Sequence, residues 1–512
     1  MHDVNVLEDQ PIAWTPTADV IERAQITRFM KQIGVSTWDE LYEYSIANVE
    51  RFTEEVLKFL DIKFDPPYEK LLDTSDGIEF PTWFRSSDTL EKSADPPVRM
   101  SAKHERETQP SSNSVSPENV SAEPSFAGGT GDADKSVRAP VRAPVGTPSA
   151  GLNITEMCLD RWQTDEMKDQ PAVIWEGEEG GSTILSYAEL KAGVDACVEK
   201  LVGLDLGQGD AVGMHLPMIP ETVIALLAIN RIGAIAVPVF SGYGIDAISS
   251  RMEAVGAKAI FTCDGFPRRG KAFDMMTVAA RAVANVPSIE SVILVERSSY
   301  VTPAANESKD HVEAREERRM QLKHYEYLRH DVFAGRRIAI WGVGMGEPAS
   351  ESSAAKTSAE DPLIILYTSG TTGKPKGIAH THASFPIKAA QDMAFGTDVG
   401  KGTRISWYTD VGWMMGPWLI YGALINGATI CIYDGAPDYP NPDRLWEFTA
   451  NHKVEILGIS PTLIRSLAAA ERSADTPVRM DAAAAFTKGT TTERRGWYRH
   501  RLPHYDGTVT QF

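Results

Sequence analysis

The sequence is poor in cysteine and in basic residues. Its four cysteines lie too far apart in 512 residues for a disulfide framework, and no pair has zinc-ligand spacing. Lys and Arg number 51 against 70 Asp and Glu, a net charge of −19, so the chain lacks the positive excess of a nucleic-acid-binding surface. We therefore expect reduced structural thiols and no nucleic-acid partner.

Long apolar runs are also missing. The longest, residues 419–433, is interrupted by Gly422, Asn426 and Gly427 and is shorter than the roughly 20 apolar residues that span a bilayer. Residues 1–16 are acidic and polar, unlike a signal peptide. The sequence predicts a cytoplasmic protein without a membrane partner. Its acidic excess, with lysine the rarer base, fits a halophilic host, although ordinary acidic proteins share it.

The chain divides into segments of different composition. Residues 19–85 have apolar residues at helical spacing and several aromatic side chains, which predict a small helical N-terminal module. Residues 86–150, rich in Pro, Ser, Glu and Ala, predict a disordered low-complexity insertion, because they cannot bury enough apolar area to offset the entropy of folding. We expect a second, polar insertion at about 297–360 and a tail unrelated to the rest at 471–512, where residues 91–102 recur in altered form.

Between residues 151 and 470, short apolar runs alternate with amphipathic helical patterns. The predicted strands lie at 171–175, 211–216, 234–240, 259–262, 291–295 and 362–367, and the predicted helices at 187–202, 221–231 and 247–255. This alternation, with Gly and Pro at the joints, predicts an α/β fold of mostly parallel sheets covered by helices.

The clearest chemical signal follows the strand predicted at 362–367. Glycines there let backbone N–H groups approach an anion, hydroxyl groups add donors, and lysines add charge. The pattern predicts a cradle for the phosphates of a polyanion such as ATP, formed by Thr368, Ser369, Gly370, Thr371, Thr372, Gly373, Lys374 and Lys376. It is no Walker A loop, because only two residues separate the first two glycines and a proline follows the first lysine.

Residues 367–377, Tyr-Thr-Ser-Gly-Thr-Thr-Gly-Lys-Pro-Lys-Gly, resemble the phosphate-loop signature of the adenylate-forming (AMP-binding) enzymes. Segments at 151–162, 216–221, 231–234 and 409–418 resemble the acetyl-CoA synthetase branch of that family, in family order. The resemblance implies the large N-terminal domain of the family fold. It also implies a reaction in which a carboxylate attacks the α-phosphate of ATP, with Mg²⁺, and coenzyme A then attacks the acyl-adenylate. The carboxylic acid stays open.

The resemblance implies two further groups of site residues. The pocket for the acyl group would include Thr409, Asp410, Trp413, Met414 and Gly416, with plain core packing as the alternative for 413–418. The nucleotide of coenzyme A would contact Arg268, Arg269 and Lys271, with a solvated basic turn as the alternative. No metal site is expected, because His380 and His382 have no third ligand at metal spacing. Residues 342–346 lack the spacing of a dinucleotide-binding loop.

Several family features are not found after residue 467. These are a Gly-Glu-Pro turn, an aromatic-x-x-Thr-Glu motif, a ribose-binding Asp and a small C-terminal domain with a catalytic Lys; Val509 stands where the motif at 505–509 needs Glu. The sequence thus predicts a truncated or disrupted acyl-CoA synthetase with weak ATP binding, little turnover and no identified catalytic residue. The alternatives are a non-catalytic nucleotide-binding remnant and an adenylating enzyme that serves a carrier protein. The oligomeric state stays open.

Overall fold

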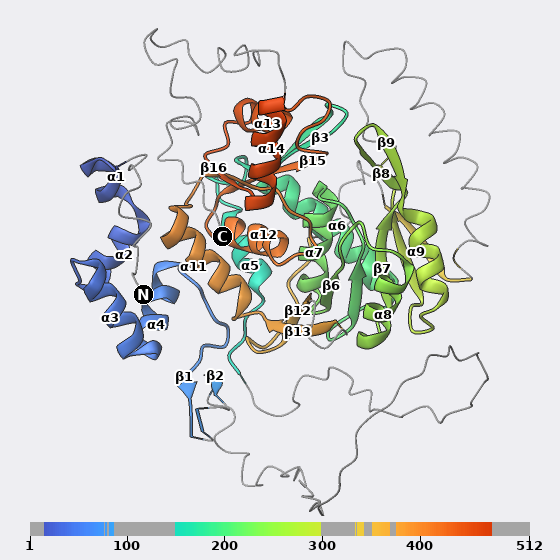
Figure 1. The fold of residues 1–512 in the computed structure, drawn as a ribbon. Helices are drawn as coiled ribbons and strands as arrows, with labels where there is room; N and C mark the ends of the chain where they lie inside the picture. The colour runs from blue at the N-terminus through green and yellow to red at the C-terminus, as the bar shows by residue number, and fades with distance from the viewer. Residues whose placement is uncertain are drawn as a thin grey trace, which may run out of the picture.

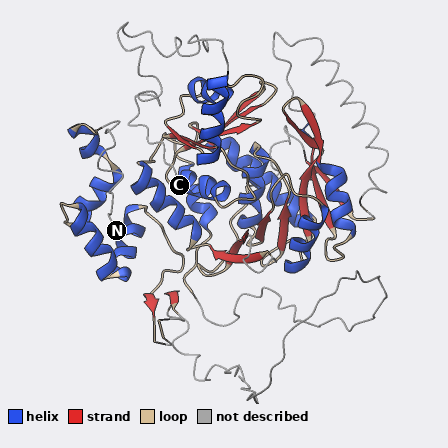
Figure 2. Cartoon of the chain, viewed as in Figure 1, coloured by secondary structure: helices blue, strands red, loops and turns tan. Residues whose placement is uncertain are grey.

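Two mostly parallel β-sheets organise the chain (Figures 1 and 2). The computed structural model describes residues 15–75, 77–78, 81–86, 149–297, 333, 335–341, 351–368 and 375–473. Within these ranges, no helix is long and apolar enough to cross a membrane. The α/β fold predicted from the alternating pattern is confirmed, as are the six predicted strands and three predicted helices.

The larger sheet has seven strands in the order β11-β10-β7-β5-β6-β12-β13, and only β13, antiparallel to β12, breaks the parallel arrangement. Its strands are β5 (Ala211–Met214), β6 (Ile235–Pro238), β7 (Ala259–Cys263), β10 (Ser291–Val295), β11 (Arg337–Trp341), β12 (Pro362–Thr368) and β13 (Lys376–Thr381). The smaller sheet has the order β16-β14-β15-β3-β4, with β4 antiparallel at one edge. Its strands are β3 (Pro171–Gly177), β4 (Ser182–Ser186), β14 (Arg404–Trp407), β15 (Thr429–Asp434) and β16 (Ile456–Gly458).

Helices cover the sheets in layers because alternate strand residues face opposite sides. In β10, Val292 and Leu294 join one buried cluster with α8 (Ile245–Val255) and α9 (Met275–Ala284). Their neighbours Ile293 and Val295 belong to the central cluster. That cluster takes in α5 (Ile154–Cys158), η2 (Asp160–Trp162), α6 (Tyr187–Gly203), α7 (Pro220–Arg231), α11 (Phe385–Thr397) and α12 (Met415–Ile425). A third cluster packs the smaller sheet against α13 (Arg444–Asn451) and α14 (Pro461–Ser473).

Local sequence signals set where these helices begin and end. Ser186 caps α6, because its hydroxyl accepts from the Glu189 N–H while the Glu189 carboxylate accepts from the Ser186 N–H. Helix α8 ends at Gly256, which takes the left-handed conformation (φ 61°) that costs glycine nothing. Gly256 thus fixes where α8 ends, shortly before β7 begins at Ala259.

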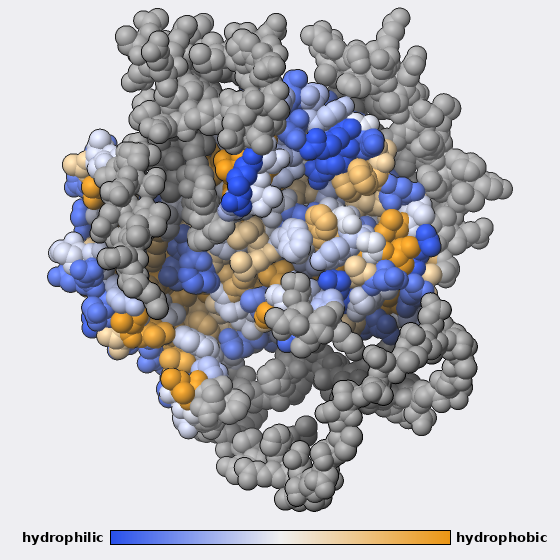
Figure 3. All heavy atoms as spheres, viewed as in Figure 1, coloured by the Kyte–Doolittle hydropathy of each residue, from blue (hydrophilic) through white to orange (hydrophobic). Residues whose placement is uncertain are grey.

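The N-terminal segment forms a helical module against α11 (Figure 1). It contains α1 (Ala18–Arg23), α2 (Gln25–Ile33), α3 (Trp38–Ala47) and α4 (Val49–Phe59), followed by the strands β1 (Lys70–Asp73) and β2 (Thr82–Arg85). The buried Phe29 joins the module to α11, since its ring centre lies 4.5 Å from that of Phe395. Figure 3 shows hydrophobic residues over these helices in separate patches among hydrophilic ones.

Two boundaries differ from those expected. The stretch 297–360 is not irregular throughout, because β11 pairs in parallel with β10 and Thr357 is buried with its hydroxyl bonded to the Leu152 carbonyl. The residues Ser149 and Ala150, expected in the insertion, belong to the folded part: Ser149 pairs with Arg85, and the Ala150 N–H donates to the Phe84 carbonyl (2.7 Å). The core of the expected insertion (87–148) and the tail from 474 lie outside the described residues.

Candidate functional site

The carboxyl ends of the two sheets meet at Asp410, one of the residues expected in the acyl pocket. The Ser241 hydroxyl, just after β6, donates to its carboxylate at 2.5 Å, and the Gly412 N–H donates at 2.8 Å. Asp410 is buried, and burial raises the pKa of its carboxyl to about 6, although the hydrogen bond from Ser241 opposes this rise. Asp410 therefore holds the segment after β14 to the segment after β6.

The turn that follows Asp410 leaves no room for a side chain at two positions, Gly412 against the segment after β6 and Gly416 against the turn's own backbone. A Cβ atom on Gly412 would lie 2.1 Å from the Phe240 nitrogen, and one on Gly416 would lie 2.5 Å from the Asp410 carbonyl oxygen. Glycine is therefore required at both positions. Two side chains between these glycines are exposed to solvent: Trp413 is 50% exposed and Met414 is 59% exposed.

Only one aromatic contact joins this turn to the larger sheet among the ring pairs of the described residues. The ring centre of Trp413 lies 5.6 Å from that of Phe240. Thr409 is half-buried beside Asp410. The structure thus gathers the five residues of the expected acyl pocket in one segment at the sheet ends, whereas the nearby Trp418 is buried against Trp407. That they bind an acyl group stays a prediction.

The expected phosphate cradle connects β12 to β13, which pair as an antiparallel hairpin. Thr368 ends β12 and pairs with Lys376, the first residue of β13, and both side chains are exposed. The remaining predicted residues, Ser369, Gly370, Thr371, Thr372, Gly373 and Lys374, lie outside the described residues. The described part therefore shows where the loop starts and ends: at the carboxyl end of a parallel strand, where helix and loop N–H groups commonly meet ligands.

The three residues expected at coenzyme A lie on the hairpin of β8 (Gly265–Arg268) and β9 (Lys271–Asp274). Arg268 is turned inward, with hydrogen bonds to the Tyr408 hydroxyl (3.2 Å) and the Gly435 carbonyl. Arg269 pairs with Asp438 at 2.7 Å, and Lys271 is exposed. Arg268 and Arg269 thus already have protein partners, although Arg269, like Lys271, is exposed to solvent.

A group of charged residues at the same sheet ends was not expected from the sequence. Arg297, after β10, pairs with Asp434 at the end of β15 (2.5 Å). Glu178, after β3, accepts from the backbone N–H groups of Gly270 (2.9 Å) and Ala436 (2.7 Å). Glu178 thus ties the β8–β9 hairpin to the smaller sheet, and the pair of Arg297 with Asp434 ties the two sheets to each other. The one sequence signal that could have pointed to these charged residues is their position directly after a strand.

Glu221, at the start of α7, is a buried acid. Both of its carboxylate oxygens lack a hydrogen-bond partner in the described part of the chain, and burial raises its pKa to about 8. Burial thus favours the neutral, protonated form of this carboxyl. His382 is another buried group: its Nδ1 accepts from the Ile154 N–H (3.2 Å), and burial lowers its pKa to about 3. No three His, Cys, Asp or Glu side chains of the described ranges are grouped to hold a metal.

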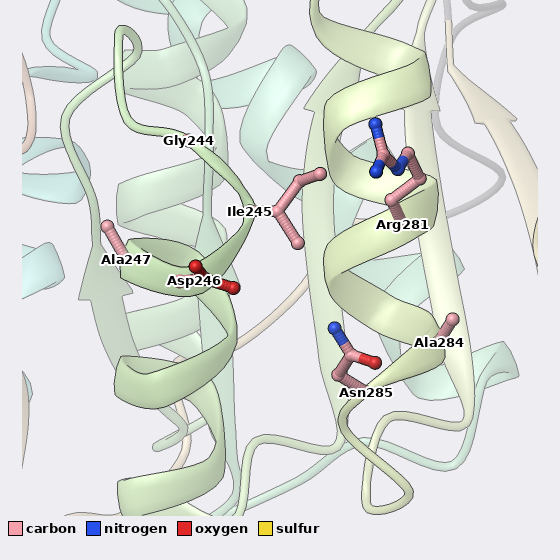
Figure 4. A pocket seen from close by; sticks show the side chains of 7 residues that line it. All are labelled: Gly244, Ile245, Asp246, Ala247, Arg281, Ala284 and Asn285. Atoms are coloured by element: carbon pink, nitrogen blue, oxygen red, sulfur yellow. The ribbon is translucent and has the colours of Figure 1, made fainter. Parts of the chain in front are cut away.

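A shallow cleft between α8 and α9 does not involve these residues. Figure 4 shows Asp246 and Ile245 at the start of α8, opposite Arg281 of α9 and Asn285, the residue after α9. None of the residues expected from the sequence to bind phosphate, the acyl group or coenzyme A lines it.

Comparison with known proteins decides the family. The family model described as "AMP-binding enzyme" matches residues 160–497, more than half of the chain. The chain belongs to the AMP-binding enzyme family. The sequence pattern predicts that the family-like region ends at residue 470, whereas the match runs on to residue 497. Most of residues 471–497 lie outside the described part of the chain. The boundary at 470 therefore stays a prediction.

Relatives within the AMP-binding enzyme family are acetyl-coenzyme A synthetases. That of Chlorobaculum tepidum is 35% identical over 61% of this chain and 43% of its own length. That of Streptomyces coelicolor is 34% identical over 69% of this chain and 50% of its own. A Nostoc linckia acetyl-coenzyme A synthetase is 35% identical over 64% of this chain and 88% of its own. The chain thus spans about half the length of the first two.

A solved relative shares the fold. Acetoacetyl-CoA synthetase from Streptomyces lividans matches 90% of this chain and 57% of its own, with a TM-score of 0.65 and 22% identity. At that identity the likeness shows the fold alone. It agrees with the two-sheet α/β architecture that the AMP-binding resemblance implies.

Proposed function

We propose that this chain binds Mg-ATP at the β12–β13 hairpin. Membership of the AMP-binding enzyme family carries the proposal, and the position of the hairpin at the carboxyl end of β12 supports it. Thr368 would donate its hydroxyl and Lys376 would place its ammonium group beside the phosphates, with Ser369, Gly370, Thr371, Thr372, Gly373 and Lys374 between them. Hydrogen bonds between charged donors and phosphate oxygens are the strong ones in such a site.

We further propose the reaction of an acyl-CoA synthetase for the protein to which this sequence belongs. A carboxylate oxygen attacks the α-phosphorus of ATP, and the bond to pyrophosphate breaks. The thiol of coenzyme A, losing its proton, then attacks the acyl carbon, and AMP leaves. N–H donors and lysine charge at the hairpin would stabilise the negative charge that builds on the departing pyrophosphate.

The two other groups of residues take supporting roles in this proposal. The exposed Trp413 and Met414 would flank the acyl group, with Thr409 and Gly416 beside them and Asp410 holding the segment in place. Lys271 would contact a phosphate of coenzyme A, since Arg268 and Arg269 already have protein partners. Similarity to acetyl-coenzyme A synthetases favours a small acid, but the acid itself stays open.

Calorimetric titration with ATP in the presence of Mg²⁺ tests the nucleotide site. We expect the full 512-residue chain to bind, and Lys376→Ala to weaken binding about tenfold by removing a charge-assisted contact. Lys388→Ala is the matched control, because Lys388 is exposed on α11 and pairs with Asp392. Equal affinity of Lys376→Ala and the unchanged chain would overturn the assignment of the hairpin.

A further inference from the structure

Arg251, on α8, is a nearly buried cation next to the base of the β12–β13 hairpin. Its side chain carries a charge but only 8% of the residue is exposed. The guanidinium carbon lies 4.5 Å from the ring centre of Tyr243 and 5.4 Å from that of Tyr367. Its Nη1 donates to the Ala247 carbonyl (2.7 Å), whereas its Nε has no hydrogen-bond partner among the described residues. Within the same residues, no carboxylate forms an ion pair with Arg251. Two ring faces, rather than an acid, hold this charge.

Tyr367 connects Arg251 to the hairpin. Its hydroxyl donates to the backbone carbonyl of Arg251 (3.1 Å), and strand alternation turns its ring toward the α8 side of the sheet. Tyr367 pairs across the hairpin with Gly377, and a Cβ atom on Gly377 would lie 3.3 Å from the Tyr367 ring. The ring therefore extends over Gly377, directly beside the pair of Thr368 with Lys376.

The group formed by Tyr243, Arg251 and Tyr367 has a further contact on the side of Tyr243. The ring of Tyr243 lies 5.5 Å from that of Phe240 in an edge-to-face arrangement, and Phe240 contacts Trp413. A continuous series of contacts thus runs from the end of β6, across α8, to β13. Its members are, in order, Phe240, Tyr243, Arg251, Tyr367 and Gly377. Edge-to-face and cation–ring contacts of this kind fix the orientation of their members.

We propose that Arg251 is a positioning residue for phosphate binding: its guanidinium group, clamped between Tyr243 and Tyr367, holds the base of the hairpin that carries Thr368 and Lys376. Its charge, which no described carboxylate neutralises, also makes the hairpin more attractive to a polyanion. The proposal rests on the ATP site proposed above and extends it to a residue that contacts no phosphate itself.

Titration of Arg251→Met with ATP and, separately, with adenosine tests the proposal. We expect affinity for ATP to fall about tenfold, because a cation–ring clamp and an unneutralised charge are lost. Affinity for adenosine, which has no phosphate, should stay the same. Arg281→Met, a change of the same kind at an exposed position on the neighbouring α9, is the control and should leave both affinities unchanged.

Two conservative variants separate positioning from folding. Arg251→Lys keeps the charge and should recover most of the ATP affinity lost in Arg251→Met. Tyr367→Phe keeps the ring but removes the hydrogen bond to Arg251, and should weaken ATP binding about twofold to threefold. If Arg251→Met does not fold, the test uses these two variants. The quantity measured is then the ratio of their affinity for ATP to their affinity for adenosine.

The outcomes distinguish this proposal from the one on which it rests. Failure of the unchanged chain to bind ATP, or an unaltered affinity in Lys376→Ala, overturns the proposed site. Weakened binding in Lys376→Ala together with unaltered binding in Arg251→Met overturns only the role of Arg251. Equal losses for ATP and adenosine in the Arg251 variants would show a general structural role and also overturn the positioning role.

Discussion

Asp410 connects the two sheets through a carboxyl group that burial keeps protonated up to about pH 6. Because its pKa in the folded chain lies above the ordinary value of 3.8, its contribution to folding is present at low pH. That contribution is lost as the pH rises through about 6, where the folded chain must ionise a buried group.

Replacing Asp410 with Asn removes this ionisation. We expect the stability of the unchanged chain, relative to that of Asp410→Asn, to fall by up to about 3 kcal/mol between pH 4 and pH 7. Denaturant unfolding of both proteins at these two pH values measures the difference. Asp392→Asn, at a half-exposed carboxyl on α11, is the control. A difference that is constant with pH would show that Asp410 is already ionised in the folded chain at pH 4.

At the scale of single residues, the sequence pointed to candidate site residues but not to the contacts that they make. The density of Gly, Ser, Thr and Lys after a predicted strand marked residues 368–376 as a candidate phosphate cradle. The structure shows its two ends, Thr368 and Lys376, paired across β12 and β13, and phosphate binding there stays a prediction. The contact of Arg251 with Tyr367 joins residues separated by 116 positions. Nothing in spacing or composition foretells it, since it depends on where α8 packs relative to β12.

Among the elements, strands with a continuous apolar run were predictable and exposed ones were not. The residues of β7, β10 and the middle of β12 are buried, as parallel strands covered on both faces should be. By contrast, β13 is an exposed edge strand that starts at a lysine, and most of β11 is half-exposed within a stretch expected to be a polar insertion. Pairing with a neighbour, rather than burial, makes these segments strands.

The packing of the helical N-terminal module on α11 gives a prediction for elements. Phe29 is fully buried and contacts Phe52 and Phe59 of α4 as well as Phe395 of α11. Phe29→Ala should cost about 3–5 kcal/mol and should raise amide hydrogen exchange in α2 and α4 more than in the sheets. Trp38→Ala on α3, where the side chain is 68% exposed, should leave exchange unchanged. Uniformly faster exchange throughout the chain would mean that the module and the sheets unfold as one unit.

For the whole molecule, family membership and fold are established, whereas activity is proposed, because the chain spans about half the length of the first acetyl-coenzyme A synthetases that it matches. The cytoplasmic location and the adaptation to high salt stay predictions, since neither contacts nor similarity test them. The net charge of −19 is a property of the whole sequence. A net charge of this size favours solubility through repulsion between like charges, which salt screens.

The segment 87–148 can be removed without separating the parts that it joins. Arg85 pairs with Ser149, and the Phe84 carbonyl accepts from the Ala150 N–H, so a short Gly-Ser linker can connect residues 86 and 149. The segment is rich in Pro, Ser, Glu and Ala, which contribute little to a hydrophobic core. We therefore expect the melting temperature of the shortened chain to stay within about 3 °C of that of the full chain, which corresponds to at most about 3 kcal/mol for a protein of this size. Its affinity for ATP should be unchanged, which makes the titration above a second readout. A much larger drop in melting temperature would show that residues 87–148 pack against the folded part and contribute to its core.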